Sequence, residues 1–420
     1  MIMLMNTVVV CLLLALIARA FYIWVKLAEL SKAYGPIYSL RLLNTPIVVI
    51  NSAEVERELL DVKSALYANR PLPSSSLQAS KISEYRDVQD YHINTFLSNL
   101  LQHPKDFFHH IRHLSAGVTV EISHGYRVMS RNDEYVKEAD VSVVNFADAA
   151  LPNNYIVDWF PSLAALPAWL PGMGFKRKAA EYRKQYYALA EEGHRMVKAE
   201  IAKGTARPSL TYTALAESSP GQYPDDIIMF TTTQVYTGGG DTSSSLLASF
   251  FLALLRKPEV VKRGHEEIDR IVGDERLPTF DDRANLPYIQ AIVAEVARVR
   301  PPISFLPRLA GQDDVYRGHH IEKDSYVLVN YWEMMHDETL YPDPDAFKPE
   351  RWLSMERNPK TYSLDVIFGS GRRVLAMFDI SPALDDNGKP IIPLEECTDG
   401  GITIKPRSSH VAKLLPGDQG

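Results

Sequence analysis

Residues 366–374 read Val-Ile-Phe-Gly-Ser-Gly-Arg-Arg-Val, a glycine-rich loop that follows an apolar run and carries two adjacent arginines. Gly369 and Gly371 permit positive φ angles and a close approach of the backbone to a bound group. The guanidinium groups of Arg372 and Arg373 can each bind a carboxylate through two hydrogen bonds. By itself the stretch is equally compatible with an ordinary turn, so its interpretation depends on the rest of the chain.

The composition is that of a folded protein. Of the 420 residues, 46% are hydrophobic and 23% are charged, which excludes wholesale disorder. The formal net charge of −7 makes nucleic acid an unexpected partner. The two cysteines, Cys11 and Cys397, form no CxxC pair, so neither a disulfide framework nor a zinc cluster is predicted.

The first 25 residues are apolar enough to cross a membrane. No charged side chain precedes Arg19, and the apolar run continues to Val25, whereas about 20 apolar residues span a bilayer. The alternative is a cleaved signal peptide, because Ala18-Arg-Ala20 has the form of a cleavage site. No positive charge precedes the run, and the run continues beyond Ala20. We therefore predict an uncleaved single-pass anchor over residues 1–25.

The following residues predict a mainly α-helical fold with small β-sheets. Residues 37–43 and 47–50 are short β-branched runs around a turn, which indicates a hairpin. Ser52 is a candidate helix cap. From about residue 88 onward helical periodicity dominates, including a charged amphipathic helix over 175–200.

A pair of histidines raises the question of a metal site. His109 and His113 stand four positions apart on a predicted helix and could share an ion. No acidic or cysteine ligand accompanies them, and there is no His-Glu-x-x-His arrangement. A solvated helix face is therefore the favoured interpretation, and no metal site is predicted there.

Residues 235–243 read Val-Tyr-Thr-Gly-Gly-Gly-Asp-Thr-Ser within a strongly apolar helical pattern. Each glycine costs a helix about 1 kcal/mol relative to alanine, so an interruption of the helix is expected here. Such interruptions are often functional. The alternative is a notch that lets a neighbouring helix approach closely. A carboxylate and a hydroxyl, Asp241 and Thr242, follow the glycines in apolar surroundings.

Four motifs resemble those of the cytochrome P450 family, in the family's order. Residues 238–243 resemble the distal-helix motif Ala/Gly-Gly-x-Asp/Glu-Thr-Thr/Ser. Glu295 and Arg298 resemble the Glu-x-x-Arg pair, and Arg351 ends a Phe-x-Pro-Glu-Arg motif whose arginine joins that pair in one network. The loop at 366–374 resembles the start of the haem-binding pattern Phe-x-x-Gly-x-Arg-x-Cys-x-Gly. The closest resemblance is to fungal P450 enzymes of secondary metabolism.

The resemblance implies a haem-thiolate monooxygenase that oxidises a lipophilic small molecule with dioxygen. Electrons would come from NADPH through NADPH–cytochrome P450 reductase, and the enzyme would be anchored in the endoplasmic reticulum membrane, facing the cytosol. Residues 32–420 would form the P450-like domain, with missing segments. The site residues that it implies are Asp241 and Thr242 for proton delivery, and Arg308, Phe368, Gly371 and Arg373 for haem binding.

The chain departs from the family where the iron ligand belongs. Leu375 stands at the position of the haem-ligating cysteine, and Met377 at that of the final glycine. The proline-rich hinge after the anchor and the helix with Trp-x-x-x-Arg are also not recognisable. Cys397 lies beside two glutamates, which oppose a thiolate. These losses favour an alternative for the 420 residues, a catalytically inactive P450 remnant or a mis-spliced product, so whether the chain is an enzyme is left open.

Overall fold

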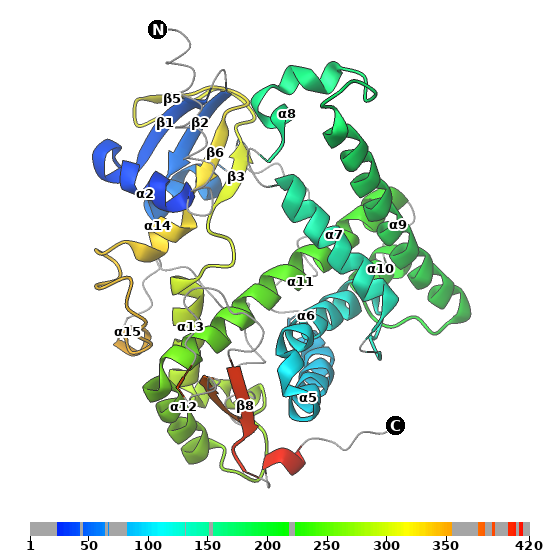
Figure 1. Ribbon diagram of the computed structural model, residues 1–420, viewed down its shortest axis with the longest axis vertical. Coiled ribbons are helices and arrows are strands. Elements are labelled where there is room, and N and C mark those ends of the chain that lie inside the picture. Colours follow the sequence, from blue (N-terminus) through cyan, green and yellow to red (C-terminus); the bar gives the residue numbers. More distant parts are fainter. Residues whose placement is uncertain are drawn as a thin grey trace. The chain divides into compact units, whose positions relative to one another are not determined.

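The computed structural model describes residues 23–42, 45–63, 66, 82–130, 132–150, 154–217, 223–354, 377–382, 389–390, 402–408 and 411–414. Two units emerge from the contacts of the chain with itself (Figure 1). Unit 1 comprises Met1–Pro71 and Gln290–Val366, and unit 2 comprises Leu72–Ile289 and Ile367–Gly420.

A four-stranded sheet in the order β1-β2-β6-β3 forms the basis of unit 1. β1 (Ile37–Leu42) pairs antiparallel with β2 (Thr45–Ile50), which confirms the predicted hairpin. β2 also pairs in parallel with β6 (Tyr326–Val329), and β6 pairs antiparallel with β3 (Leu306–Leu309). The β-branched side chains of the central strands are buried, as expected for strands inside a sheet.

The rest of unit 1 packs around this sheet. Its other elements are α2 (Ile23–Tyr34), α3 (Ala53–Glu56), η2 (Arg57–Val62), β4 (Asp314–Tyr316), β5 (His319–Ile321), α14 (Tyr331–His336) and α15 (Arg351–Ser354). Most of α13 (Pro287–Val299) also belongs to it. Ser52 occupies the predicted cap position of α3, but its side chain makes no capping hydrogen bond.

Unit 2 is a helical assembly in which α11 packs along α6, and α6 along α5. Its longer helices are α5 (Arg86–Gln102), α6 (Phe107–His124), α7 (Glu134–Ala150), α9 (Gly174–Lys203), α11 (Asp225–Arg256) and α12 (Pro258–Ile271). Its short helices are η3 (Ile82–Tyr85), η4 (Pro104–Asp106), α8 (Ile156–Trp159), η5 (Pro161–Ala165), α10 (Leu210–Tyr212), η6 (Thr213–Glu217), η7 (Asp281–Asn285) and η8 (Val411–Leu414). β7 (Phe378–Pro382) and β8 (Ile402–Pro406) form a two-stranded antiparallel sheet. The mainly α-helical fold with small sheets is confirmed.

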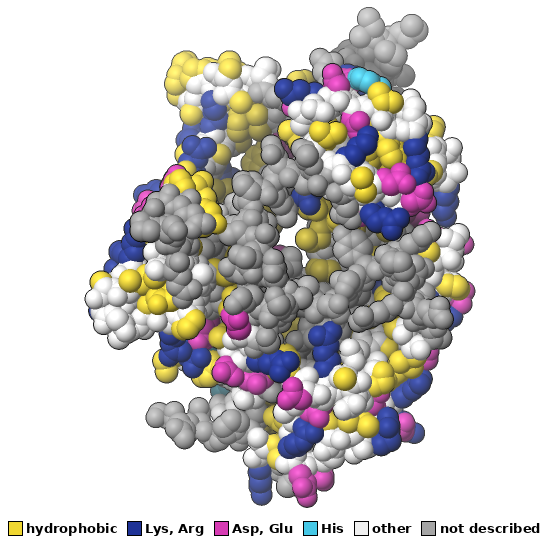
Figure 2. Space-filling view, turned by 180° about the vertical axis from the view of Figure 1, so that it is seen from behind, with side chains coloured by type: hydrophobic (Ala, Val, Ile, Leu, Met, Phe, Trp, Pro, Cys, Tyr) yellow, Lys and Arg dark blue, Asp and Glu magenta, His cyan; other side chains and the backbone are white. Residues whose placement is uncertain are grey.

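Two further observations concern the predicted membrane anchor and the charge of the surface. No helix within the described ranges is long and apolar enough to cross a membrane, and residues 1–22 of the predicted anchor lie outside those ranges. On the face shown in Figure 2, acidic and basic side chains stand beside one another. The prediction of a single P450-like domain over 32–420 stays a prediction.

Candidate distal helix and arginine–glutamate network

Helix α11 runs without interruption from Asp225 to Arg256, so the predicted break at the three glycines is wrong. The reason is close packing between helices. A Cβ added to Gly239 would lie 2.7 Å from Cγ2 of Thr119 on α6, which real side chains do not tolerate. Gly239 is thus the packing notch that the sequence left open as an alternative. Burial of the apolar residues that follow, such as Phe251, stabilises the helix against the glycine cost.

Asp241 and Thr242 project from different sides of α11, because successive residues of a helix are rotated by about 100°. The Thr242 hydroxyl donates a hydrogen bond to the carbonyl oxygen of Gly238, 2.8 Å away. The Asp241 side chain is exposed and lines a small cavity between α6, α7 and α11. The predicted acid–alcohol pair is therefore present in sequence, but its two side chains face different surroundings.

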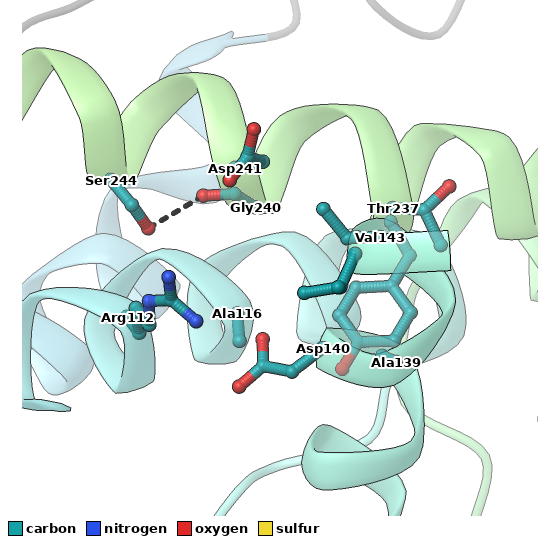
Figure 3. A pocket seen from close by; sticks show the side chains of 11 residues that line it. Arg112, Ala116, Ala139, Asp140, Val143, Thr237, Gly240, Asp241 and Ser244 are labelled. Atoms are coloured by element: carbon teal, nitrogen blue, oxygen red, sulfur yellow. Dashed lines mark hydrogen bonds between the residues drawn. The ribbon is translucent and has the colours of Figure 1, made fainter. Parts of the chain in front are cut away.

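Arg112 from α6 and Asp140 from α7 line the same cavity as Asp241 (Figure 3). Burial raises the pKa of Asp140, the Arg112 guanidinium lowers it, and the Asp241 carboxylate raises it again, so that it lies above its ordinary value. The Ser244 hydroxyl donates to the carbonyl of Gly240 on the same wall, at 2.7 Å. The cavity thus brings together one cation and two carboxylates in unit 2.

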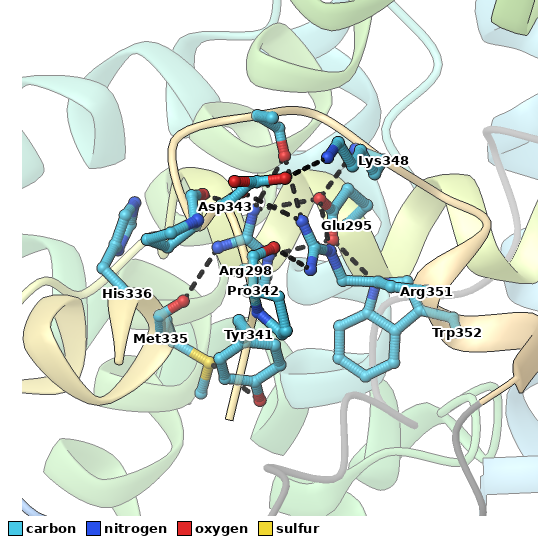
Figure 4. A network of polar contacts seen from close by, with 12 residues as sticks. Glu295, Arg298, Met335, His336, Tyr341, Pro342, Asp343, Lys348, Arg351 and Trp352 are labelled. Carbon is cyan, nitrogen blue, oxygen red and sulfur yellow. Dashed lines mark hydrogen bonds and ion pairs between the residues drawn. The ribbon is translucent and has the colours of Figure 1, made fainter. Parts of the chain in front are cut away.

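Glu295 is the centre of a buried network in unit 1 (Figure 4). Arg298 donates from Nε and Nη2 to its two carboxylate oxygens, each at 2.9 Å, and Arg351 donates from Nε at 3.1 Å. Glu295 and Arg298 are both completely buried. The structure therefore brings together the three residues that the Glu-x-x-Arg and Phe-x-Pro-Glu-Arg motifs predicted to interact.

The network also has members that the sequence analysis missed. The indole nitrogen of Trp352 donates to Glu295 at 2.8 Å, and the backbone nitrogen of Lys348 does so at 2.9 Å. Arg298 uses its remaining donors on backbone carbonyls, those of Met335, Pro344 and Ala346. The only hint in the sequence was the position of Trp352 directly after Arg351.

These donors keep Glu295 ionised in a buried place. Burial raises the pKa of its carboxyl, but hydrogen bonds from Arg298, Lys348 and Trp352 and the Arg298 charge outweigh that effect and lower it. A buried charge pair needs such additional hydrogen bonds to satisfy its remaining donors and acceptors. The network fixes α13 to the segment 342–352, which precedes the loop at 366–374 in the sequence.

Of the four residues predicted to bind haem, the structure describes only Arg308. Arg308 lies on β3 opposite Val327 of β6 and is half-buried. Phe368, Gly371 and Arg373 lie outside the described residues. The haem-binding roles of these four residues stay predictions, as do the roles of Asp241 and Thr242.

The two histidines on α6 lie in different surroundings, so the predicted solvated helix face holds for His109 but is wrong for His113. His113 is buried, and its Nε2 interacts with the carbonyl oxygen of Ser130 at 3.0 Å. His109 is exposed, with its ring centre 6.3 Å from that of His113. Within the described part of the chain, no cluster of three or more His, Cys, Asp or Glu side chains could hold a metal ion.

Comparison with known proteins decides the family. The family model for cytochrome P450 matches residues 102–374. The chain is a member of the cytochrome P450 family. It is 33% identical to cytochrome P450 monooxygenase COX2 of Coprinopsis cinerea, over 90% of this chain and 82% of that protein. It is 31% identical to cytochrome P450 monooxygenase claR of Ampulloclitocybe clavipes, over 93% of this chain and 84% of that protein.

The structural comparison agrees. A zebra fish cytochrome P450 solved with progesterone superposes on this P450 with a TM-score of 0.64, covering 91% of this chain and 99% of the other. The two sequences are 21% identical, so this likeness shows the fold alone. The predicted P450 fold and fungal affinity are therefore confirmed.

The residue at the iron-ligand position of the loop does not fit a thiolate-ligated haem. The described residues of this P450 contain no cysteine, since Cys11 and Cys397 lie outside them. In the sequence, Leu375 stands where the haem loop requires cysteine, and a hydrocarbon side chain has no lone pair to donate to iron. The family implies haem, whose thiolate ligand favours O–O cleavage, but this chain does not supply that ligand at position 375.

Proposed function

We propose that the function of this scaffold is P450-type monooxygenation of a lipophilic small molecule, with one atom of dioxygen entering the substrate. The family match over 102–374, together with the Glu295–Arg298–Arg351 network, carries this proposal. The fungal relatives are described as monooxygenases, which supports the same reaction class here.

The partners in this proposal follow from the family. NADPH–cytochrome P450 reductase would deliver the electrons. Residues 1–25 would anchor the chain in the endoplasmic reticulum membrane with the catalytic part facing the cytosol, which the uncharged run before Arg19 supports. A membrane location would bring the enzyme close to lipophilic substrates.

Leu375 favours a second candidate, in which the chain is a P450 without catalytic activity. The alignment to the Coprinopsis relative supports it as well. That alignment extends over 434 positions, more than the 420 residues of this chain, although it covers only 90% of the chain. The relative therefore has positions without a counterpart here, as expected if blocks of sequence have been lost.

Haem ligation distinguishes the two candidates. The purified chain is supplied with haem, reduced under carbon monoxide, and examined for the absorbance band of a thiolate-ligated haem. We expect no such band for the chain as it stands, because residue 375 is leucine. Leu375→Cys restores the spacing Phe368-x-x-Gly371-x-Arg373-x-Cys and should produce the band if the scaffold still holds haem.

Leu375→Ser is the matched control, because serine is similar in size to cysteine but provides no thiolate. A band in the unchanged chain would overturn the inactive candidate. No band in Leu375→Cys, with the protein folded by circular dichroism, would overturn the monooxygenase proposal.

A further inference from the structure

A group of buried rings lies where α6, α7, α9 and α11 meet in unit 2. We call it the histidine–tyrosine cluster; it consists of His124, Tyr135, His194 and Tyr236, with exposed fractions of 4%, 7%, 6% and 1%. The His124 ring stands edge-on to both tyrosine rings, with centres 6.3 Å apart in each case. The two tyrosines stack on each other at 5.6 Å. Four helices thus share one polar, water-excluded contact.

One nitrogen of His124 has no hydrogen-bond partner. Its Nδ1 lies 2.7 Å from Oγ of Ser123, but its Nε2 is buried and unpaired. The Nε2 atom faces the backbone of α9, because a Cβ added to Gly193 would lie 2.9 Å from it. Helix α9 can approach His124 this closely because residue 193 is glycine.

His194, the neighbour of Gly193 on α9, completes the joint. Its Nε2 lies 3.2 Å from Oδ1 of Asp225 at the start of α11, close enough for an ion pair, although neither ring nitrogen has a hydrogen-bond partner. Asp225 also accepts a hydrogen bond from Lys198 of α9 at 2.6 Å. His194 therefore has a carboxylate beside its ring, whereas no carboxylate is hydrogen-bonded to His124.

Several charged groups of the surrounding elements have other partners, and Glu138 and Asp140 of α7 act on Tyr135 and Tyr236 but form no described ion pair with His124. Glu121 of α6 binds His92 of α5 and two arginines, Arg127 and Arg207. On α9, Glu192 pairs with Arg195, and before α7, Asp133 accepts from Tyr126. Helix α10 contributes the Thr211 hydroxyl, which donates to the carbonyl of Ser123. None of these described interactions neutralises a proton on Nε2 of His124.

Burial, together with the nearby charge of His194, lowers the pKa of His124 to about 4. The same burial raises the pKa of Tyr135 and Tyr236, so both phenols stay neutral at physiological pH. A protonated His124 would place a positive charge against Gly193, and within the described residues no carboxylate is hydrogen-bonded to its ring. Such an uncompensated buried charge strongly disfavours the packed arrangement.

We propose that the histidine–tyrosine cluster is an acid-sensitive joint, which holds α9 against α6 while His124 is neutral and releases it when His124 is protonated. When α9 moves away, water reaches His124 and hydrates its charge. The packed state has its full stability above pH 6.5, the ordinary pKa of histidine. It loses that stability as the pH falls toward the His124 pKa of about 4.

Hydrogen–deuterium exchange of the full chain tests the joint. Between pH 7.5 and pH 5, amide protection in α9 over Leu189–Val197 should fall by about 30-fold after correction for intrinsic exchange. This factor follows if the pKa of His124 is about 4 in the packed state and 6.5 once α9 has moved away. Protection in the apolar part of α11, Leu246–Leu255, serves as the internal reference and should stay constant.

The variant His124→Phe keeps the ring and removes the titration, so its α9 protection should change less than threefold over the same range. His109→Phe, an exposed histidine on the same helix, is the matched control and should behave like the unchanged chain. Unchanged α9 protection in the natural chain, or an undiminished loss in His124→Phe, would overturn the proposal.

If His124→Phe does not fold, the natural chain decides by itself. With histidine rings labelled for NMR, His124 should remain neutral down to about pH 5 and become protonated only together with the loss of α9 protection. A His124 ring that protonates above pH 6 while α9 stays protected would refute the joint.

Discussion

Each unit of this P450 contains a buried glutamate that binds two arginines, and the two sites differ in how deeply those arginines are buried. Glu295 in unit 1 pairs with Arg298, which is completely buried, and Arg351, whose side chain is 7% exposed. Glu121 in unit 2 is also buried, but its partners Arg127 and Arg207 are 27% and 49% exposed.

The two sites also differ in their other donors. Glu295 is completed by an indole and a backbone amide, neither of which titrates, whereas Glu121 is completed by His92 at 2.8 Å. In unit 1, removal of the Glu295 carboxylate would leave the Arg298 charge buried without a counter-charge. In unit 2, removal of the Glu121 carboxylate would leave Arg127 and Arg207, which water can reach. The exposure of the partners, more than their number, is therefore expected to set the free-energy cost of losing such a glutamate.

The largest effect is expected for Glu295→Gln. It leaves the Arg298 charge buried without its counter-charge, so the free energy of unfolding should fall by about 4 kcal/mol. Urea denaturation followed by circular dichroism measures the loss. Glu338→Gln, at an exposed position, is the control and should stay within about 0.5 kcal/mol of the natural chain. A loss below about 1 kcal/mol in Glu295→Gln would contradict the comparison.

Glu121→Gln should be less damaging, with a loss of about 2 kcal/mol, because Arg127 and Arg207 gain water when the carboxylate is removed. The loss should also depend on pH. Burial raises the pKa of Glu121, but hydrogen bonds from His92 and Arg127 outweigh it, so the pKa lies below its ordinary value of 4.5. The stabilisation is therefore present above pH 4.5 and is lost as the pH falls through the lower, folded-state value.

Urea denaturation of Glu121→Gln and the natural chain across this range checks that sign. The difference between their unfolding free energies should shrink as the pH falls below 4.5. A difference that grows on acidification would mean that the Glu121 carboxylate is not held ionised by its partners.

The smallest effect is expected for Arg207→Ala, below about 1 kcal/mol, because half-exposed ion pairs contribute little. Arg127→Ala is the informative partner variant. It removes the shorter contact with Glu121, at 2.6 Å, and the stacking of the guanidinium on Tyr91 at 4.2 Å, so it should cost more. Thermal unfolding of both variants ranks them; equal losses would show that exposure does not distinguish the two arginines.

The sequence predicted the Glu295 site and missed the Glu121 site for a physical reason. Glu295 and Arg298 are one helical turn apart, and their motif could be recognised beside that of Arg351. Glu121 is joined to His92 and Arg207, which lie 29 and 86 positions away. Only the tertiary fold brings them together, and Arg207 comes from the connection between α9 and α10. A Cβ on Gly117 would lie 2.6 Å from Nδ1 of His92, so the space that admits this histidine is visible only in three dimensions.

The glycines of α11 show the same limit. Local propensity predicted a broken helix, but the helix is continuous, because the stability of a helix in a protein depends chiefly on the packing of its faces. The hairpin at 37–50, by contrast, was predictable, since its strands and turn are adjacent in sequence.

The family motifs, the apolar N-terminal run and the leucine at position 375 can be read from the sequence, because they depend only on the order of the side chains. The three-dimensional arrangement was needed to show that Gly239 is a notch for Thr119, that Asp241 and Thr242 face different surroundings, and that His124 is enclosed with two tyrosines. Those features depend on how closely helices far apart in the chain approach one another, and that distance is set by the packing of the whole unit.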